Sequence, residues 1–178
     1  GVTFARSTVS NLNHCNPCIL LQSLRVKCSD NRSACQESVG GENIMIHYKE
    51  IDSGLIDNIK GLFRSEGWSA YLDDDLKLKR AFDNSLYILG VFDDKELIGF
   101  IRCIGDGEHA VIIQDIIVDD KYKRQGLGKL LMHRVLEKYS SVRWIQVNTD
   151  ISDKRANSFY HSLGMRTLEQ AGIISFCR

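Results

Sequence analysis

A loop with two glycines, Gly126 and Gly128, constrains the fold of this chain more than any other stretch of its sequence. Residues 111–118 precede the loop and are rich in β-branched side chains, which favour a strand. Residues 127–135 follow it with leucine and valine at helical spacing. Glycine lets a backbone approach a ligand closely, and the first N–H groups of a helix are unpaired at the positive end of its dipole. The loop therefore predicts an anion site, and the expected anion is a phosphate.

Two standard phosphate-binding motifs do not match this loop. A dinucleotide-binding fingerprint needs a third glycine where the chain has Leu131. A Walker loop needs glycine where the chain has Lys123, and serine or threonine where it has Leu130. What remains is a basic residue, two spacers, a glycine, one spacer and a second glycine.

A second motif lies near the C-terminus, around Tyr160. The pattern predicts a short helix over 153–163, which Gly164 stops. Phe159 and Leu163 are four residues apart and are expected to share the buried face of this helix. Tyr160 is either a half-buried core aromatic or a functional hydroxyl, and the glycine loop upstream favours the functional interpretation.

Both motifs resemble those of the GNAT superfamily of N-acyltransferases. Residues 123–128 look like its Q/R-x-x-G-x-G/A loop, which holds the pyrophosphate of acetyl-CoA. Residues 156–165 look like its A-x-x-F-Y-x-x-L-G-F segment, and the resemblance covers residues 45–178. Three positions depart from the family pattern: Lys123 replaces glutamine or arginine, Asp120 stands where many members have proline, and Met165 replaces the final aromatic residue.

The order of the elements predicts an α+β protein with the GNAT fold, a mixed and mostly antiparallel central sheet flanked by helices. A β-α-β-α-β arrangement begins with the strand before the glycine loop and ends the chain. Three consecutive aspartates at 73–75 are interpreted as a helix N-terminus rather than a metal cluster. Cys103 and Cys177 are expected to be buried thiols in apolar strands. The other expected elements are a first strand at 45–51, helices at 53–64 and 76–82, a hairpin of strands at 86–92 and 97–104, and a strand at 142–147.

The resemblance implies roles for the motif residues. Tyr160 would protonate the departing CoA thiolate, because a phenol of pKa ~10 can donate a proton to a thiolate whose parent pKa is ~8.5. Backbone N–H groups of the strand that ends at Val118 would bind the oxyanion. The residues expected to bind acetyl-CoA are Ile116, Ile117, Val118, Lys123, Arg124, Gln125, Gly126, Leu127, Gly128, Lys129 and Asn157.

The sequence offers several candidates for the general base. Asp115 is the best carboxylate if it faces the cleft, and strand alternation places it on the opposite face from Gln114. The alternative is that neighbouring backbone groups hold the Asp115 carboxylate. Asp106, Glu108 and His109 are further candidates, and a chain of water molecules is another. No metal is expected to take part.

These features predict an N-acetyltransferase that moves an acetyl group from acetyl-CoA to a primary amine of a small molecule. The amine would attack directly within a ternary complex, without a covalent enzyme intermediate. The chain is loosely similar to the short bacterial and plastid members that include arylalkylamine acetyltransferases. Two alternatives stay open: acetylation of a protein or peptide amine, and a non-catalytic acyl-CoA sensor that would keep the glycines without needing Tyr160.

Composition agrees with one enzyme domain. The 178 residues carry 23 basic and 23 acidic side chains, and this zero net charge argues against a general nucleic-acid binder. No apolar run approaches the ~18 residues that span a bilayer. Neither nucleic acid nor a membrane is therefore expected as a partner. The expected location is the cytoplasm, and a homodimer is left open.

The first 44 residues differ from the rest, because no acidic residue occurs before Asp30. We expect a disordered extension over 1–44, either a leader or sequence added in cloning, followed by the acetyltransferase domain at 45–178. An organelle transit peptide, for example for the plastid, is one alternative. A zinc site made of two pairs of cysteines is another alternative, although six residues separate the cysteines of the second pair, where two to four are usual. The four cysteines of such a site would be Cys15, Cys18, Cys28 and Cys35.

Overall fold

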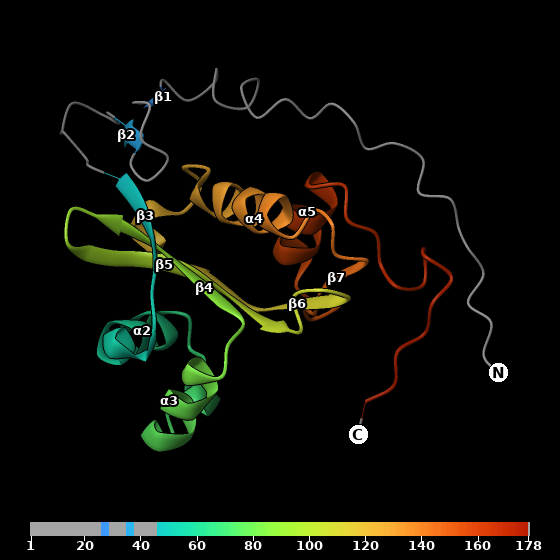
Figure 1. Ribbon diagram of the computed structural model, residues 1–178, viewed down its shortest axis with the longest axis horizontal. Helices are drawn as coiled ribbons and strands as arrows, with labels where there is room; N and C mark the ends of the chain where they lie inside the picture. Colours follow the sequence, from blue (N-terminus) through green and yellow to red (C-terminus); the bar gives the residue numbers. More distant parts are fainter. Residues whose placement is uncertain (1–25, 29–34, 38–45, 178) are drawn as a thin grey trace.

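The computed structural model describes residues 26–28, 35–37 and 46–177. Its centre is a five-stranded sheet in the order β3-β4-β5-β6-β7 (Figure 1). Neighbouring strands are antiparallel except β6 and β7, which are parallel. This mixed, mostly antiparallel sheet confirms the predicted architecture. The strands are β3 (Ile46–Glu50), β4 (Tyr87–Asp93), β5 (Glu96–Gly105), β6 (Ala110–Val118) and β7 (Trp144–Val147).

Helices cover both faces of the sheet: α2 and α3 lie on one side, and α4 and α5 on the other (Figure 1). Each side has its own apolar cluster, because successive strand residues point to opposite faces. Phe100 and Ile117 pack with α2 and α3, whereas Val111 and Ile113 pack with α4. The helices are α2 (Ile56–Ser65), α3 (Asp75–Asp83), α4 (Leu127–Lys138) and α5 (Lys154–Ser162); short 3₁₀ turns are η1 (Ser53–Leu55), η2 (Ser69–Tyr71) and η3 (Asp120–Tyr122).

Two helices begin where the sequence predicts. The carboxylate of Asp74 accepts a hydrogen bond from the backbone N–H of Lys77 at 2.9 Å, so the aspartate run caps α3. Asp153 accepts one from the backbone N–H of Ala156 at 2.9 Å and caps α5 in the same way. Side-chain capping of this kind satisfies N–H groups that have no partner within the helix.

A bulge in β6 shifts its alternation in the middle of the strand. Arg102 of β5 pairs with Asp115, but the next residue, Cys103, pairs with Ile113, so Gln114 is left over. The pairing of β6 with β7 also ends here, at Ile113 opposite Val147. Residues 114–118 consequently have no neighbouring strand on that edge among the described residues.

The C-terminal strand that the sequence predicts is not formed. Residues 163–177 contain turns and extended chain but no strand. The reason is a local turn in which the backbone N–H of Ile173 donates to the Leu168 carbonyl at 2.8 Å, while Gly172 adopts φ 72°. Phe176 is 87% exposed, and Cys177 is likewise exposed rather than buried in a strand. Cys103, in contrast, is fully buried as expected.

Two short strands lie within the segment expected to be a disordered extension. β1 (Val26–Cys28) and β2 (Cys35–Glu37) pair in antiparallel fashion, with Cys28 opposite Cys35 in the backbone register. The other two cysteines of the zinc hypothesis, Cys15 and Cys18, lie outside the described residues. The division at residue 45 and the hypotheses about residues 1–44 therefore stay predictions.

Candidate functional site

The glycine loop presents a row of backbone N–H groups. After η3 the chain turns through Arg124 and Gly126, which both adopt left-handed backbone conformations, with φ 65° and 88°. The first hydrogen bond of α4 joins the N–H of Leu130 to the carbonyl of Gly126 at 3.0 Å. No described residue accepts a hydrogen bond from the N–H groups of 124–129. These N–H groups, at the positive end of α4, lie where the sequence predicts an anion site.

Gly128 lies where α4 meets α5. An added Cβ at this position would lie 3.6 Å from the Phe159 ring, which is an ordinary van der Waals contact. Packing alone therefore does not demand glycine here. Leu127 is buried, so it can offer a ligand only its backbone N–H group.

Lys123 fastens the loop to helix α2 instead of extending into solvent. Its ammonium pairs with Glu66, just after α2, and with Asp120 at 2.5 Å. Burial alone would lower the pKa of Lys123, but the hydrogen bonds to Asp120 and Glu66 raise it overall. Arg124 and Lys129 form no ion pair with a described residue. They are the cations left to attract an anion.

The remaining predicted cofactor residues fall into two groups. The side chain of Gln125 donates to the Lys121 carbonyl at 3.1 Å and stiffens the loop. The Asn157 amide donates to the carbonyl of Asp153 at 2.7 Å, which stabilises the start of α5. Ile117 and Val118 are buried and Ile116 is half-buried, so they offer a ligand mainly their backbone groups. The N–H groups of an antiparallel strand alternate between its two edges, and the Asp119 N–H donates to Ile98 of β5, so the N–H of Ile117 also faces β5. The N–H groups of Ile116 and Val118 lie on the other edge of β6, from which β7 has separated.

Tyr160 lies half-buried on α5 beside Phe159, with the ring centroids 5.2 Å apart. Burial, and then the nearby Asp153 carboxylate, raise the pKa of Tyr160 above its ordinary value of 10.0. The phenol is thus protonated at neutral pH. No described residue forms a hydrogen bond with its hydroxyl group.

Asp115 does not stand as an open carboxylate, because charged and polar side chains hold both of its oxygens. Arg102 Nε donates to Asp115 Oδ2 at 2.5 Å, and the Tyr71 hydroxyl donates to Oδ1 at 2.8 Å. Arg102 and Asp115 are only 4% and 2% exposed. The Arg102 guanidinium also lies 4.9 Å from the centre of the Phe82 ring and donates to Ser85 Oγ at 3.3 Å. The sequence analysis offered one alternative to a general base, in which neighbouring backbone groups hold the Asp115 carboxylate. The structure is close to that alternative, but side chains rather than backbone groups bind the carboxylate.

Gln114 and Asp115 do not point to opposite faces as predicted. Gln114 Nε2 lies 3.3 Å from the Tyr71 hydroxyl, the same group that donates to Asp115. The bulge at Gln114 is the physical reason, since an extra residue interrupts the alternation of a strand. Sequence reasoning placed Trp68 and Tyr71 near the acceptor but missed Arg102 and the contact of Tyr71 with Asp115. One signal was available, because Arg102 is a single charge within an apolar strand that neighbours the strand of Asp115.

The further candidate bases lie at the other end of β6, in the turn before it. One carboxylate oxygen of Asp106 accepts hydrogen bonds from the backbone N–H groups of Glu108, His109 and Ala110, at 2.8–2.9 Å. These bonds, from Ala110 first, lower the pKa of Asp106 to about 2. Asp106 therefore shapes the turn. The β6 strand, roughly 27 Å long at ~3.4 Å per residue, separates this turn from the glycine loop.

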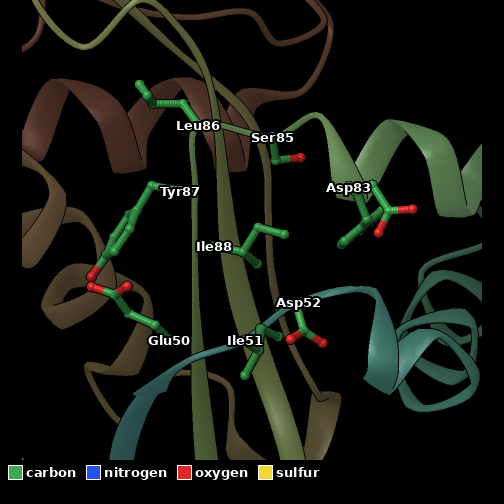
Figure 2. A pocket seen from close by; sticks show the side chains of 9 residues that line it. Glu50, Ile51, Asp52, Asp83, Ser85, Leu86, Tyr87 and Ile88 are labelled. Atoms are coloured by element: carbon green, nitrogen blue, oxygen red, sulfur yellow. The ribbon is translucent and has the colours of Figure 1, made fainter.

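Figure 2 shows a hollow of about 240 Å³ that contains none of the predicted site residues. It lies between the ends of β3 and α3 and the start of β4. Its three carboxylates are already engaged: Asp83 pairs with Lys79 at 2.8 Å, Glu50 pairs with Lys138 at 3.8 Å, and Asp52 accepts a hydrogen bond from the N–H of Gly54 at 2.7 Å. The hollow is thus a surface feature apart from the glycine loop.

The described residues contain neither a metal-binding cluster nor a membrane-spanning helix. No group of three or more histidine, cysteine, aspartate or glutamate side chains in this part of the chain could hold a metal ion. None of its helices is long and apolar enough to cross a membrane.

Comparison with known proteins identifies the family. Residues 55–165 match the sequence model of the Acetyltransferase (GNAT) family, so the chain belongs to that family. The fold is the mixed α+β GNAT fold, and the curated relatives are named N-acetyltransferases.

Three relatives illustrate the match. An uncharacterized N-acetyltransferase, ycf52, of Gracilaria tenuistipitata var. liui is 33% identical over 97 residues, covering 51% of this chain and 52% of its own. The chloroplastic GCN5-related N-acetyltransferase 1 of Arabidopsis thaliana is 31% identical over 111 residues, covering 61% and 55%. A solved GNAT-family acetyltransferase from Streptococcus pneumoniae TIGR4 superposes with a TM-score of 0.65 at 28% identity, covering 75% of this chain and 97% of its own. The chain spans about half the length of the curated relatives it matches.

Proposed function

We propose that this chain transfers the acetyl group of acetyl-CoA to a primary amine of a small molecule, by direct attack in a ternary complex. One observation carries the proposal: the unpaired N–H groups of 124–129 follow, after the short turn η3, the β6 edge that β7 leaves open. A free strand edge beside an anion site suits a ligand that has a diphosphate at one end and an extended amide chain at the other. The diphosphate fits the anion site, and the amide chain fits the strand edge. Family membership makes acetyl-CoA the expected ligand.

The diphosphate would lie against the loop N–H groups, with Arg124 and Lys129 adding positive charge. The backbone N–H groups of Ile116 and Val118 on the open edge would hydrogen-bond the thioester arm and the oxyanion that forms on attack. Acetyl-CoA supplies the activated acyl group, and the protein contributes binding and orientation.

Tyr160 is proposed as the general acid for the departing thiolate. Its raised pKa keeps the phenol protonated at neutral pH, and its hydroxyl has no competing partner among the described residues. A proton donor placed beside a leaving thiolate makes its departure easier.

Asp115 is proposed to position other groups rather than to act as the base. Protonating its carboxylate would leave the buried Arg102 without a counter-charge, which is costly. The amine would then lose its proton to water, the route that needs no further side chain.

The decisive experiment is acetyl-CoA turnover against a panel of amines, followed by release of free thiol. The panel should contain small arylalkylamines, linear diamines and a lysine-containing peptide. Thiol release with a small amine supports the proposal, and preference for the peptide supports the protein-amine alternative. Binding of CoA without turnover of any amine would favour the acyl-CoA sensor. A rise in melting temperature with CoA measures binding separately, because a ligand specific for the folded state stabilises it.

The cellular location and the assembly stay proposals. The Arabidopsis relative is named chloroplastic, which favours the plastid over the cytoplasm for this chain as well. Imaging of the protein with a fluorescent tag would decide between the two locations. The homodimer left open by the sequence can be tested by sedimentation.

A further inference from the structure

The segment from Glu66 to Tyr71 lies alongside β6 on the α2 side of the sheet, and each of its ends contacts another part of the chain. At one end Glu66 pairs with Lys123 in the glycine loop. At the other end the Tyr71 hydroxyl donates to Asp115 beside the bulge. The segment therefore spans the stretch of β6 between the bulge and the loop, which is the stretch that β7 leaves open.

The Tyr71 hydroxyl has a fixed hydrogen-bond polarity. Asp115 Oδ2 is held by Arg102, and Oδ1 accepts the single phenolic proton at 2.8 Å. The phenolic oxygen can then only accept further hydrogen bonds. The amide of Gln114, an exposed residue, is its one donor among the described residues, at a long 3.3 Å. A better donor could replace it.

Tyr71 also remains neutral. Burial raises the pKa of Tyr71, and the Asp115 carboxylate adds to the rise, against the hydrogen bond from Gln114 and the charge of Arg102, which lower it. A neutral phenol whose proton is committed to a carboxylate is an acceptor for N–H groups and not a base. Phe63 fixes the ring, since the two rings stack at 4.4 Å with an angle of 2° between their planes.

We propose that Tyr71 accepts a hydrogen bond from the primary amine substrate and so positions its nitrogen at the β6 bulge, with the Arg102–Asp115 pair holding Tyr71. The half-buried Trp68, whose ring centre is 6.1 Å from that of Tyr71, forms an apolar wall for the carbon body next to the nitrogen. The substrate class is a primary amine on an apolar or aromatic body. This inference rests on the proposed function, because it assigns the acceptor side of the same site.

The test measures amine binding without turnover. The protein is saturated with CoA and titrated with 2-phenylethylamine, and Trp68 emission is followed in a Trp144→Phe background. The matched probe is N,N,N-trimethyl-2-phenylethylammonium, which has the same body and charge but no N–H group. A hydrogen bond to a charged group is typically worth about 10- to 100-fold in affinity. The primary amine should therefore bind about that much more tightly than the trimethylated probe.

Tyr71→Phe should abolish this preference, with the two probes binding equally weakly. A purely structural role of Tyr71 would instead lower the affinity for both probes by the same factor and leave their ratio unchanged. Gln114→Met removes the competing donor, so the primary amine should bind at least as tightly as to the parent. Tyr87→Phe removes a hydroxyl on the α4 side of the sheet and should change neither affinity.

Three results would overturn the inference: an unchanged preference in Tyr71→Phe, weaker amine binding in Gln114→Met, or no amine binding to the CoA-saturated parent. None of these three results depends on the glycine loop. If CoA did not raise the melting temperature of the parent protein, the proposed function itself would be refuted, so the two failures are distinguishable.

Discussion

Arg102→Met should destabilise the protein strongly, because it leaves the Asp115 carboxylate buried without its counter-charge. Both partners are at most 4% exposed, and their closest atoms are 2.5 Å apart. Removing one member of a buried ion pair typically costs about 3–5 kcal/mol. For a chain of this length 1 kcal/mol corresponds to about 2–4 °C, so the melting temperature should fall by roughly 6–20 °C.

The double variant Arg102→Met/Asp115→Leu separates the interaction energy of the ion pair from the effects of its surroundings. With both charges gone no uncompensated ion remains, so the double variant should recover most of the loss. Urea unfolding of the parent, both single variants and the double variant gives the coupling energy from the midpoints, provided that the slopes agree. We expect a coupling of about 3 kcal/mol. Strictly additive losses, or a loss below about 1 kcal/mol in Arg102→Met, would refute the reasoning.

Further predictions concern the loop, the phenol, the hairpin turn and the N-terminal segment. Gly128→Val should abolish the CoA-induced rise in melting temperature. Gly128→Ala should keep the fold, because its added Cβ only touches Phe159. Calorimetry on both variants checks these two expectations. Tyr160→Phe should lower kcat by about 10²–10³-fold with little change in KM for acetyl-CoA. The rate of the parent protein should decline only above pH 10, as the Tyr160 phenol ionises. Asp106 has a pKa lowered to about 2 from 3.8, so its stabilisation is complete above pH 4 and lost as the pH falls through 2. The melting-temperature difference between Asp106→Asn and the parent should vanish over that range. Residues 45–178 expressed alone should fold and turn over like the full chain; zinc bound by the full chain and lost with stability on truncation would contradict this.

The open strand edge explains why the site needs several separate elements. The bulge at Gln114 and the end of the β7 pairing at Ile113 occur together, so β6 offers free backbone groups where the acyl chemistry is proposed. The glycine loop begins at the end of the same strand. The Lys123–Glu66 ion pair then joins this loop to the segment proposed to face the acceptor. Under the proposed function, this ion pair would link CoA bound at the loop to the acceptor side.

Much of this protein could be predicted from short stretches of sequence, because the physics involved is local. A glycine in a left-handed conformation before a helix, and an aspartate that caps the next helix, depend on neighbouring residues alone. Gly126 and Asp153 therefore behave as their sequence context predicts. The order of helices and strands along the chain, from β3 to α5, also followed from patterns of period two and 3.6.

Only the tertiary structure decided which long-range partners the charged residues take. Lys123 meets Glu66, 57 residues away, and Asp115 meets Arg102 and Tyr71 because a one-residue bulge sets the register between β5 and β6. Strand alternation cannot reveal such a bulge, and a shift of one residue reverses the face on which a side chain lies. Residues 163–177 show the same limit: their apolar pattern predicts a strand, but a strand forms only where a neighbouring edge accepts its hydrogen bonds.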